Sequence, residues 1–227
     1  MRMHKKRNLA KRLGDCESRL ISVKPDSLNC LEAVKNKEYF DYSELFGNPN
    51  PVELEIGCGK GGFICTLAKR NPDINYIAVE KIANVIVTGC ERAEREDIPN
   101  VKFLKLGAEY LPKYIPLNSV ENIYLNFSCP YPKNRHENNR LTNPKFLEVY
   151  KLLLKEGGRI FQKTDNMHFF EYSLEQFSKS GYALENISLD LHNSGFENNI
   201  VTEYEKRFSD LGQPIYRLEA FINNTEK

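Results

Sequence analysis

The ten residues from Glu53 to Gly62 constrain the fold of this chain more than any other segment. They read Glu-Leu-Glu-Ile-Gly-Cys-Gly-Lys-Gly-Gly, so an apolar strand carrying acidic residues ends directly in a turn with G-x-G-x-x-G spacing at Gly57, Gly59 and Gly62. Glycine can adopt positive φ and lets the backbone approach a ligand, while the N–H groups of a following helix face that ligand. The segment therefore predicts the small-molecule-binding first turn of an α/β domain.

Two acidic residues narrow the identity of the ligand. Glu55 lies two residues before Gly57, where its carboxylate would repel a dinucleotide phosphate and attract an ammonium group. Glu80 ends the next apolar stretch, at the spacing where an acid at a strand end can bind both hydroxyls of a ribose. Adenosine with a cationic amino-acid tail suits both acids, so the pattern favours S-adenosyl-L-methionine. The alternative is a structural glycine turn flanked by two surface acids.

Strand and helix patterns alternate regularly from residue 51 onward, which predicts an α/β fold with a mostly parallel sheet covered by helices on both faces. Seven strands are expected, over residues 52–56, 75–79, 101–106, 120–126, 158–163, 184–190 and 215–221. Helices are expected over residues 62–69, 82–95, 144–154, 167–180 and 202–211, with Asn143 as the cap of the third. We divide the chain into a basic arm and lead-in, 1–50, and a single catalytic domain, 51–227. Ligands of such sheets bind beyond the carboxyl ends of the strands.

Composition is ordinary for a soluble globular protein, with 41% hydrophobic and 28% charged residues. No apolar run reaches the roughly 18 residues of a membrane span, and no signal-like apolar core follows the basic first residues, so we expect a cytoplasmic protein without membrane contact. The cysteines show neither a C-x-x-C pair nor zinc spacing, which indicates reduced thiols and no metal site. They are Cys16, Cys30, Cys58, Cys65, Cys90 and Cys129.

The formal net charge is only +1, so a nucleic-acid surface has to come from clustered cations. An amino-terminal arm without an acid before Asp15 carries one cluster, but isolated basic tails are often solvated ends. A second cluster follows the strand expected over residues 120–126, beside the predicted ligand site. The arm contains Arg2, Lys5, Lys6, Arg7, Lys11 and Arg12, and the second cluster contains Lys133, Arg135, His136 and Arg140.

The segment from residue 126 to 142 combines rigid, aromatic and basic residues. Pro130 and Pro132 stiffen the backbone where the reactive end of the cofactor should point, and Tyr131 lies between them. Such a segment suits a base stacked beside Tyr131 and phosphates held by the cations that follow, as proteins bind splayed-out RNA nucleotides. The alternative is a structural proline-rich turn followed by a solvated basic loop.

Four ordered motifs resemble those of the bacterial tRNA (guanine-N7)-methyltransferases: the glycine turn, residues 126–136, residues 163–166 and residues 202–205. The resemblance covers nearly the whole chain. It implies a Rossmann-like class I methyltransferase fold and methylation by S-adenosyl-L-methionine at N7 of a guanine in the tRNA variable loop, with tRNA as partner and a monomer or homodimer as the assembly. It further implies a cofactor site of Glu55, Gly57, Gly59, Glu80, Gly107, Ala108, Asn126 and Cys129. Guanine and RNA would contact Lys133, Arg135, His136, Arg140, Asp165, Thr202, Glu203, Tyr204 and Glu205.

Three positions depart from the family pattern. The family usually has aspartate where this chain has Cys129, tryptophan where it has Tyr131, and a polar side chain where it has Gly107. The aspartate is the residue usually assigned a catalytic role. Guanine N7, however, carries a free lone pair and no proton, so orientation is the main requirement. A carboxylate near the purine, from Asp165 or Glu203, would stabilise its developing positive charge.

Two other functions fit parts of the sequence. A protein that binds cofactor and tRNA with little or no catalysis is consistent with Cys129 in place of aspartate. A nicotinamide-dependent oxidoreductase is consistent with the glycine turn alone, but Glu55 and the absence of an obvious proton-relay pair speak against it. His136 in its basic loop and His168 beside two phenylalanines are typical of contact or packing residues.

Overall fold

The computed structural model describes residues 6–23 and 34–223. The strands are β1 (Leu20–Ile21), β2 (Val52–Ile56), β3 (Asn75–Val79), β4 (Val101–Leu104), β5 (Val120–Asn126), β6 (Leu154–Thr164), β7 (Tyr182–Ser188) and β8 (Tyr216–Ile222). The α-helices are α1 (Leu9–Gly14), α3 (Tyr42–Phe46), α4 (Gly62–Arg70), α5 (Ala83–Arg95), α6 (Leu111–Tyr114), α7 (Pro144–Leu153), α8 (Met167–Lys179) and α9 (Glu203–Ser209). Short 3-10 helices are η1 (Ala108–Tyr110), η2 (Asn134–Asn139) and η3 (Leu191–Asn193).

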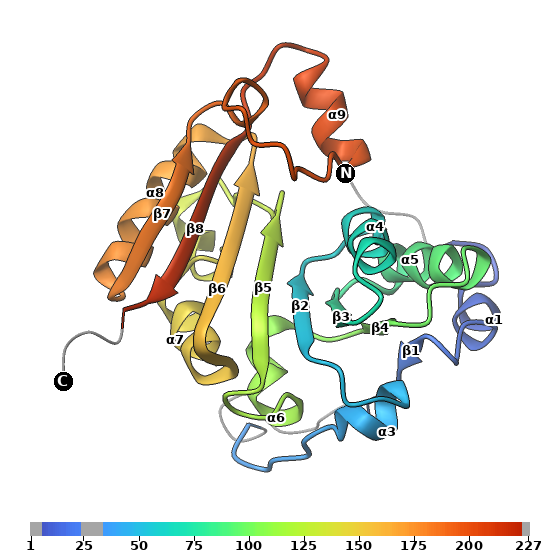
Figure 1. Ribbon diagram of the computed structural model, residues 1–227. Coiled ribbons are helices and arrows are strands. Elements are labelled where there is room, and N and C mark those ends of the chain that lie inside the picture. The colour runs from blue at the N-terminus through green and yellow to red at the C-terminus, as the bar shows by residue number, and fades with distance from the viewer. Residues whose placement is uncertain (1–5, 24–33, 224–227) are drawn as a thin grey trace.

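Within these residues the strands form one sheet in the order β1-β4-β3-β2-β5-β6-β8-β7. Pairs from β1 to β6 are parallel, whereas β8 is antiparallel to both β6 and β7. The predicted α/β fold with a mostly parallel sheet is confirmed. The chain runs outward from β2 through β3 to β4 and then returns to β5, on the other side of β2. The topological switch point therefore lies between the neighbouring strands β2 and β5 (Figure 1).

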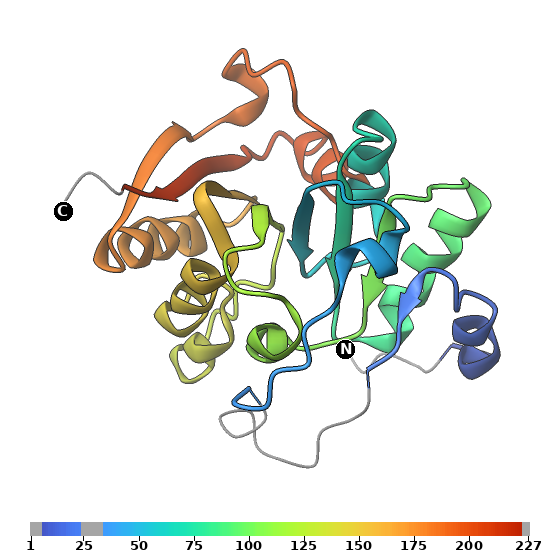
Figure 2. The ribbon, with the colours of Figure 1, turned by 60° about the horizontal axis from the view of Figure 1, so that its bottom comes forward.

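Two buried clusters hold helices to the two faces of the sheet. Alternation along β3 sends Tyr76 and Ala78 toward one cluster and Ile77 and Val79 toward the other. The first cluster packs α4 and α5 against β3 and β4, and α1 lies against α5. The second includes α7 and α8 residues such as Phe170. Figures 1 and 2 show α1, α4 and α5 on one side and α6, α7 and α8 on the other.

The expected elements appear with small boundary shifts, and the sheet has one strand more than the expected seven. Strand β1 lies in the lead-in, where no periodic pattern indicated it, and Leu20 and Ile21 pair with Phe103 and Leu104 of β4. Asn143 caps α7 as predicted, because its side chain accepts from the backbone N–H of Lys145. The division of the chain at residue 50 stays a prediction.

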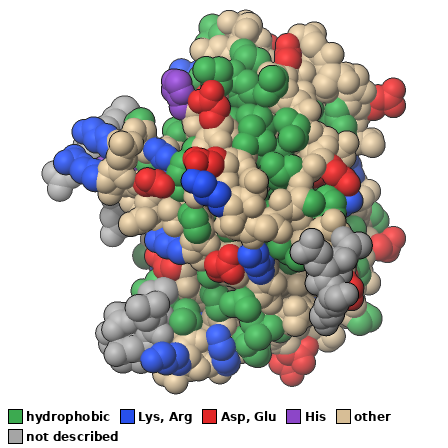
Figure 3. Space-filling view, turned by 90° about the vertical axis from the view of Figure 1, so that its left-hand side faces the viewer, with side chains coloured by type: hydrophobic (Ala, Val, Ile, Leu, Met, Phe, Trp, Pro, Cys, Tyr) green, Lys and Arg blue, Asp and Glu red, His purple; other side chains and the backbone are tan. Residues whose placement is uncertain are grey.

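The face formed by α8 and β7 exposes several apolar side chains. Ile187 and Leu189, at the end of β7, are 49% and 64% exposed, and hydrophobic side chains gather in the upper half of this face (Figure 3). Among the described helices, none is long and apolar enough to cross a membrane. Described cysteines carry free thiols, with Cys129 exposed and the other four buried, and Cys30 lies outside the described residues.

Candidate active site

The glycine turn after β2 is fastened to the neighbouring strand. Both Gly57 and Cys58 donate backbone hydrogen bonds to the carbonyl of Val79, at 2.8 and 3.0 Å. Gly57 and Gly59 have φ values of +81° and +58°, which side chains with a β-carbon rarely adopt. These contacts hold the turn at the switch point, with α4 beginning directly behind it.

Glu55 is buried at the carboxyl end of β2 with an incomplete set of hydrogen bonds. Its side chain is 2% exposed, and one oxygen accepts from Asn126 Nδ2 at 3.1 Å. The other oxygen, Oε2, has no hydrogen-bond partner among the described residues. Burial raises the pKa of Glu55 to about 7, although the amide of Asn126 and the charge of Lys163 act in the opposite direction. An ammonium group arriving here would complete the shell of this carboxylate.

Glu53, two residues earlier on the same face, has both of its oxygens satisfied. They accept from Asn122 Nδ2 at 2.6 Å and from the Tyr124 hydroxyl at 2.9 Å. The contrast shows that β2 carries one structural carboxylate and one carboxylate suited to a ligand. The sequence pattern does not distinguish them, because the two acids lie two residues apart and therefore point to the same face of the strand.

Two cavities meet at the turn. The first, about 410 Å³, extends from Gly57 past Glu80 to Lys145, and the second, about 380 Å³, extends from Gly57 past Glu55 to Tyr204. Gly57 and Phe127 line both cavities. A ligand that spans the turn would therefore place one end in each cavity.

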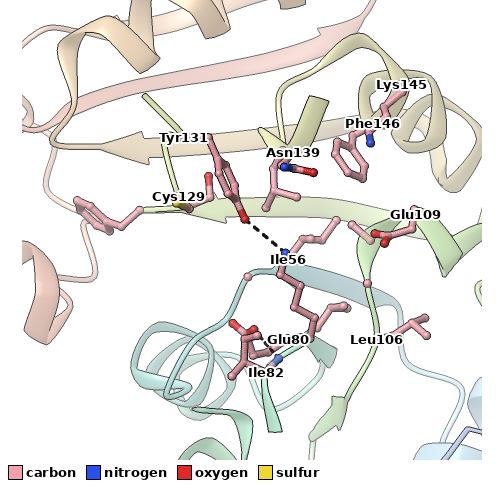
Figure 4. A pocket seen from close by; sticks show the side chains of 18 residues that line it. Ile56, Glu80, Ile82, Leu106, Glu109, Cys129, Tyr131, Asn139, Lys145 and Phe146 are labelled. Atoms are coloured by element: carbon pink, nitrogen blue, oxygen red, sulfur yellow. Dashed lines mark hydrogen bonds between the residues drawn. The ribbon is translucent and has the colours of Figure 1, made fainter. Parts of the chain in front are cut away.

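The first cavity suits an adenosine. Glu80 lies at its rim, and Glu80 Oε1 accepts from the backbone N–H of Ile82 at 2.9 Å, which orients the carboxylate. Apolar walls come from Ile56, Val79, Ile82, Leu106 and Ala108. Figure 4 shows Glu80 and Ile82 on one side of the cavity and Tyr131 and Asn139 on the other. Lys81 Nζ donates to the Tyr131 hydroxyl at 3.4 Å across the mouth.

The second cavity is aromatic. The ring of Tyr204 lies 5.1 Å from that of Phe127, and Phe63 also lines the wall. Tyr204 has a raised pKa, first through burial and then through the charge of Asp165. Asp165 follows β6 directly and is half-buried, and desolvation raises its pKa as well. Of these two predicted site residues, Tyr204 lines this cavity, whereas Asp165 is not among the residues that line it. Phe63 and Phe127 were not predicted as site residues.

The segment after β5 has an unusual backbone. Phe127 and Tyr131 have φ values of +49° and +42°, in the left-handed region that is uncommon for bulky residues. Phe127 N donates to the carbonyl of Lys163 at 2.8 Å. Arg140 holds the other end, since Nε donates to the Pro130 carbonyl at 3.0 Å and Nη2 to that of Tyr131 at 3.1 Å. The Arg140 guanidinium also lies 4.4 Å from the Tyr172 ring centroid, and its contact with RNA stays a prediction.

Glu205 lies in the interior of the protein. Its side chain is fully buried, with Oε2 2.7 Å from Lys163 Nζ and Oε1 2.6 Å from Asn199 Nδ2. Lys163 Nζ also donates to Asn199 Oδ1 and to the Ile200 carbonyl, each at 2.9 Å. The carboxylate is therefore engaged inside the protein, and its contact with a guanine stays a prediction. It anchors the start of α9 to the end of β6.

Thr202 and Glu203 flank this anchor. The Thr202 hydroxyl caps α9 by accepting from the backbone N–H of Glu205 at 3.0 Å, and the T-x-x-E spacing of a helix start is the sequence signal for this cap. Glu203 is 73% exposed and pairs with Arg92 of α5 at 2.5 Å. Glu203 and Arg92 both line the second cavity, so Arg92 reduces the negative field that Glu203 contributes there.

The remaining cations divide into engaged and exposed groups. Arg12 binds Glu91 of α5 through two hydrogen bonds of 2.6 and 2.7 Å, and the Lys6 backbone N–H donates to Asn84. The described part of the basic arm thus packs against α5, while Arg2 and Lys5 lie outside the described residues. Lys133 and Arg135, at the start of η2, are exposed beside Tyr131, and His136 presents its ring to Tyr131 edge-on.

The residues at the switch point fit S-adenosyl-L-methionine. They provide a buried carboxylate oxygen of Glu55 without a partner, the carboxylate of Glu80 for a ribose, and an apolar cavity for the base.

Solved structures of similar fold are methyltransferases. The 16S rRNA methyltransferase KamB aligns with a TM-score of 0.60 and 17% identity, covering 82% of this chain and 95% of that one. A SAM-dependent methyltransferase from Aquifex aeolicus aligns with a TM-score of 0.54 and 16% identity, covering 87% and 100%. Fold and site together define a class I methyltransferase dependent on S-adenosyl-L-methionine.

Sequence relatives specify the family. A family model described as putative methyltransferase matches residues 49–218. The tRNA (guanine-N(7)-)-methyltransferase of Listeria monocytogenes serotype 4a (strain HCC23) is 51% identical over 189 residues, which cover 82% of this chain and 88% of the relative. That of Bacillus subtilis (strain 168) is 51% identical over 179 residues, covering 79% and 84%. The chain belongs to the tRNA (guanine-N(7)-)-methyltransferase family, as its motifs indicated.

Proposed function

We propose that the protein transfers the methyl group of S-adenosyl-L-methionine to N7 of a guanine in the variable loop of tRNA, in the cytoplasm. The observation that carries the proposal is the junction of two cavities at Gly57 and Phe127. One cavity suits adenosine, and the other brings a carboxylate for the amino-acid tail together with aromatic rings for a base. The activity named for the relatives from Listeria and Bacillus supports the same reaction.

The cofactor, when bound, supplies an electrophilic methyl group on a sulfonium. Glu55 would hold the ammonium and Glu80 the ribose hydroxyls, which together orient the ligand along the turn. Guanine N7 has a lone pair and no proton, so the site needs no general base to create the nucleophile. Phe127 and Tyr204 would set the plane of the base, and their contact at 5.1 Å gives that wall a defined shape.

We propose that a carboxylate stabilises the reacting base, from Glu203, which lines the second cavity, or from Asp165, which follows β6 directly. Methylation makes the purine cationic, and a carboxylate held beside it in a partly desolvated place favours that charge. Burial raises the pKa of Tyr204, and the charge of Asp165 raises it further. Cys129 lines the adenosine cavity with an exposed thiol. We assign it to packing near the junction and assign the negative field to Glu203 or Asp165.

Phosphates of the RNA would bind the exposed cations at the start of η2. Lys133 and Arg135 lie beside Tyr131, which itself lines the adenosine cavity. A backbone that contacts these cations would bring a splayed-out base to the neighbouring cavity. Monomer and homodimer both stay open as the assembly.

Methyl transfer from radiolabelled S-adenosyl-L-methionine to unmodified tRNA transcripts, followed by mapping of the modified base, tests the proposal. Label at N7 of a variable-loop guanine is the expected result. Label at another position, or at another atom, would refute it. A second candidate, a binding protein without catalysis, is favoured by Cys129 where the family has aspartate, and tight binding of cofactor and tRNA without transfer would establish it.

A further inference from the structure

Gly107, between β4 and η1, borders the adenosine cavity and lacks a side chain for a specific reason. Its φ of −77° and ψ of 143° suit any residue, so the backbone does not require glycine. A β-carbon built there would, however, lie 2.6 Å from Glu109 Oε2 and 2.8 Å from Oε1. The carboxylate of Glu109 thus occupies the space that a side chain on Gly107 would fill.

Glu109 is an exposed residue, and its carboxylate lies at one end of the adenosine cavity. Glu109 lines the cavity together with Gly107 and Ala108, on the far side from the Glu80 rim (Figure 4). Leu106 and Phe146 line the cavity with apolar side chains, and Lys145 lines it with a cationic one. In an adenosine whose ribose is held by Glu80, the base extends away from that rim, along the walls toward η1. The polar edge of the base then reaches the neighbourhood of Glu109.

We propose that Glu109 is a specificity-determining residue that accepts a hydrogen bond from the exocyclic amino group of the adenine, in place of a side chain at position 107. The inference rests on the proposed use of S-adenosyl-L-methionine. A carboxylate only accepts hydrogen bonds, so it favours the amino group of adenine and repels the carbonyl oxygen that hypoxanthine carries at the same position. A second acid on Gly107 would crowd the first, which explains why glycine is compatible with Glu109.

Calorimetry on the full-length protein separates this role from a general one. The probes are S-adenosylhomocysteine and S-inosylhomocysteine, which differ only at the edge that Glu109 would contact. Wild type should bind the adenosine compound more tightly. Glu109→Ala should weaken that binding by about 10- to 100-fold and remove most of the preference, because a charge-assisted hydrogen bond is lost. Glu109→Gln keeps the shape and should lower the preference, since its amide can also donate to the inosine carbonyl.

Moving the carboxylate gives an independent test. Gly107→Asp alone should weaken binding of S-adenosylhomocysteine, since two carboxylates then share one space. Combined with Glu109→Ala, the same substitution should restore affinity and the preference for adenine. Glu148→Ala, which removes an exposed carboxylate on α7, serves as the control and should change neither.

Unchanged preference in both Glu109 variants would overturn the inference while leaving the cofactor proposal intact, because S-adenosylhomocysteine would still bind. Failure of the wild-type protein to bind S-adenosylhomocysteine at all would overturn the cofactor proposal and this inference with it. Additive effects of the Gly107 and Glu109 substitutions would also overturn it, because two groups that share one space must couple.

Discussion

Breaking the Lys163–Glu205 pair should destabilise the protein far more than breaking an exposed pair on the same helix. Both side chains are buried, and their charged atoms are 2.7 Å apart. Burial lowers the pKa of Lys163, and the charge of Glu205 opposes this shift. Lys163→Met would leave the carboxylate with Asn199 and with His192, 3.2 Å away. Glu205→Gln would leave a buried ammonium with two neutral acceptors.

The structure sets the expected magnitude. Removing one partner of a buried ion pair strands the other charge away from water, which costs about 3 to 5 kcal/mol of unfolding free energy. Removing both charges in the double variant leaves no stranded ion, so it should lose less than the sum of the singles by about 2 kcal/mol or more. Lys206 and Asp210 on α9 provide the control, since they are 2.9 Å apart but exposed. Their disruption should cost less than about 0.5 kcal/mol.

Urea unfolding followed by circular dichroism measures these free energies, and methyl transfer to tRNA measures the effect on α9. We expect Glu205→Gln to reduce methyl transfer, because Tyr204, which lines the second cavity, lies on the same helix α9. The affinity for S-adenosylhomocysteine should change little, because the residues that line the adenosine cavity lie outside α9. Singles that each cost under about 1 kcal/mol, or that add within about 0.5 kcal/mol, would refute the reasoning.

Four further outcomes follow from the site. Glu80→Ala should weaken cofactor binding by about 10-fold or more in calorimetry, because ribose hydroxyls lose a charged acceptor; unchanged affinity would sink the ribose assignment. Arg135→Ala should lower the slope of log affinity for tRNA against log salt by about one unit, with cofactor affinity unchanged. Cofactor affinity of the wild type should rise between pH 6 and 8, because Glu55 ionises through its pKa of about 7, and Glu55→Gln should flatten that profile. The folding stability that comes from the uncharged form of Glu55 is present in full below its usual pKa of 4.5. It is lost as pH rises through about 7. Cys129→Asp should change the single-turnover rate only modestly; acceleration of about 100-fold would show that the missing carboxylate carries the electrostatic stabilisation, and an inert wild type beside an active Cys129→Asp would support the binding-protein alternative.

The sequence predicted the strands and the glycine turn, which depend on interactions within a few residues. Short apolar stretches located β2, β3 and β5, and the spacing of Gly57 and Gly59 located the turn, because these signals act within a few residues. The buried ion pair of Glu205 with Lys163 was not predictable in this way. Its partner Lys163 is 42 positions away in the sequence, and both lie in motifs that also fit ligand contact. The sequence likewise did not indicate that the Arg140 guanidinium binds two backbone carbonyls, and its contact with RNA stays a prediction.

The shape of the segment after β5 does not depend on the side chain of Cys129. Left-handed backbone at Phe127 and Tyr131 persists only where the surroundings hold it. The Lys163 carbonyl holds the start, and the guanidinium of Arg140 holds the carbonyls on either side of the Pro130–Tyr131 bond. None of these contacts uses the residue at position 129. Exchanging aspartate for cysteine there therefore removes a charge but leaves the geometry of the junction in place. Guanine N7 needs orientation more than proton removal, so the loss of this charge should slow the reaction less than a loss of the geometry would.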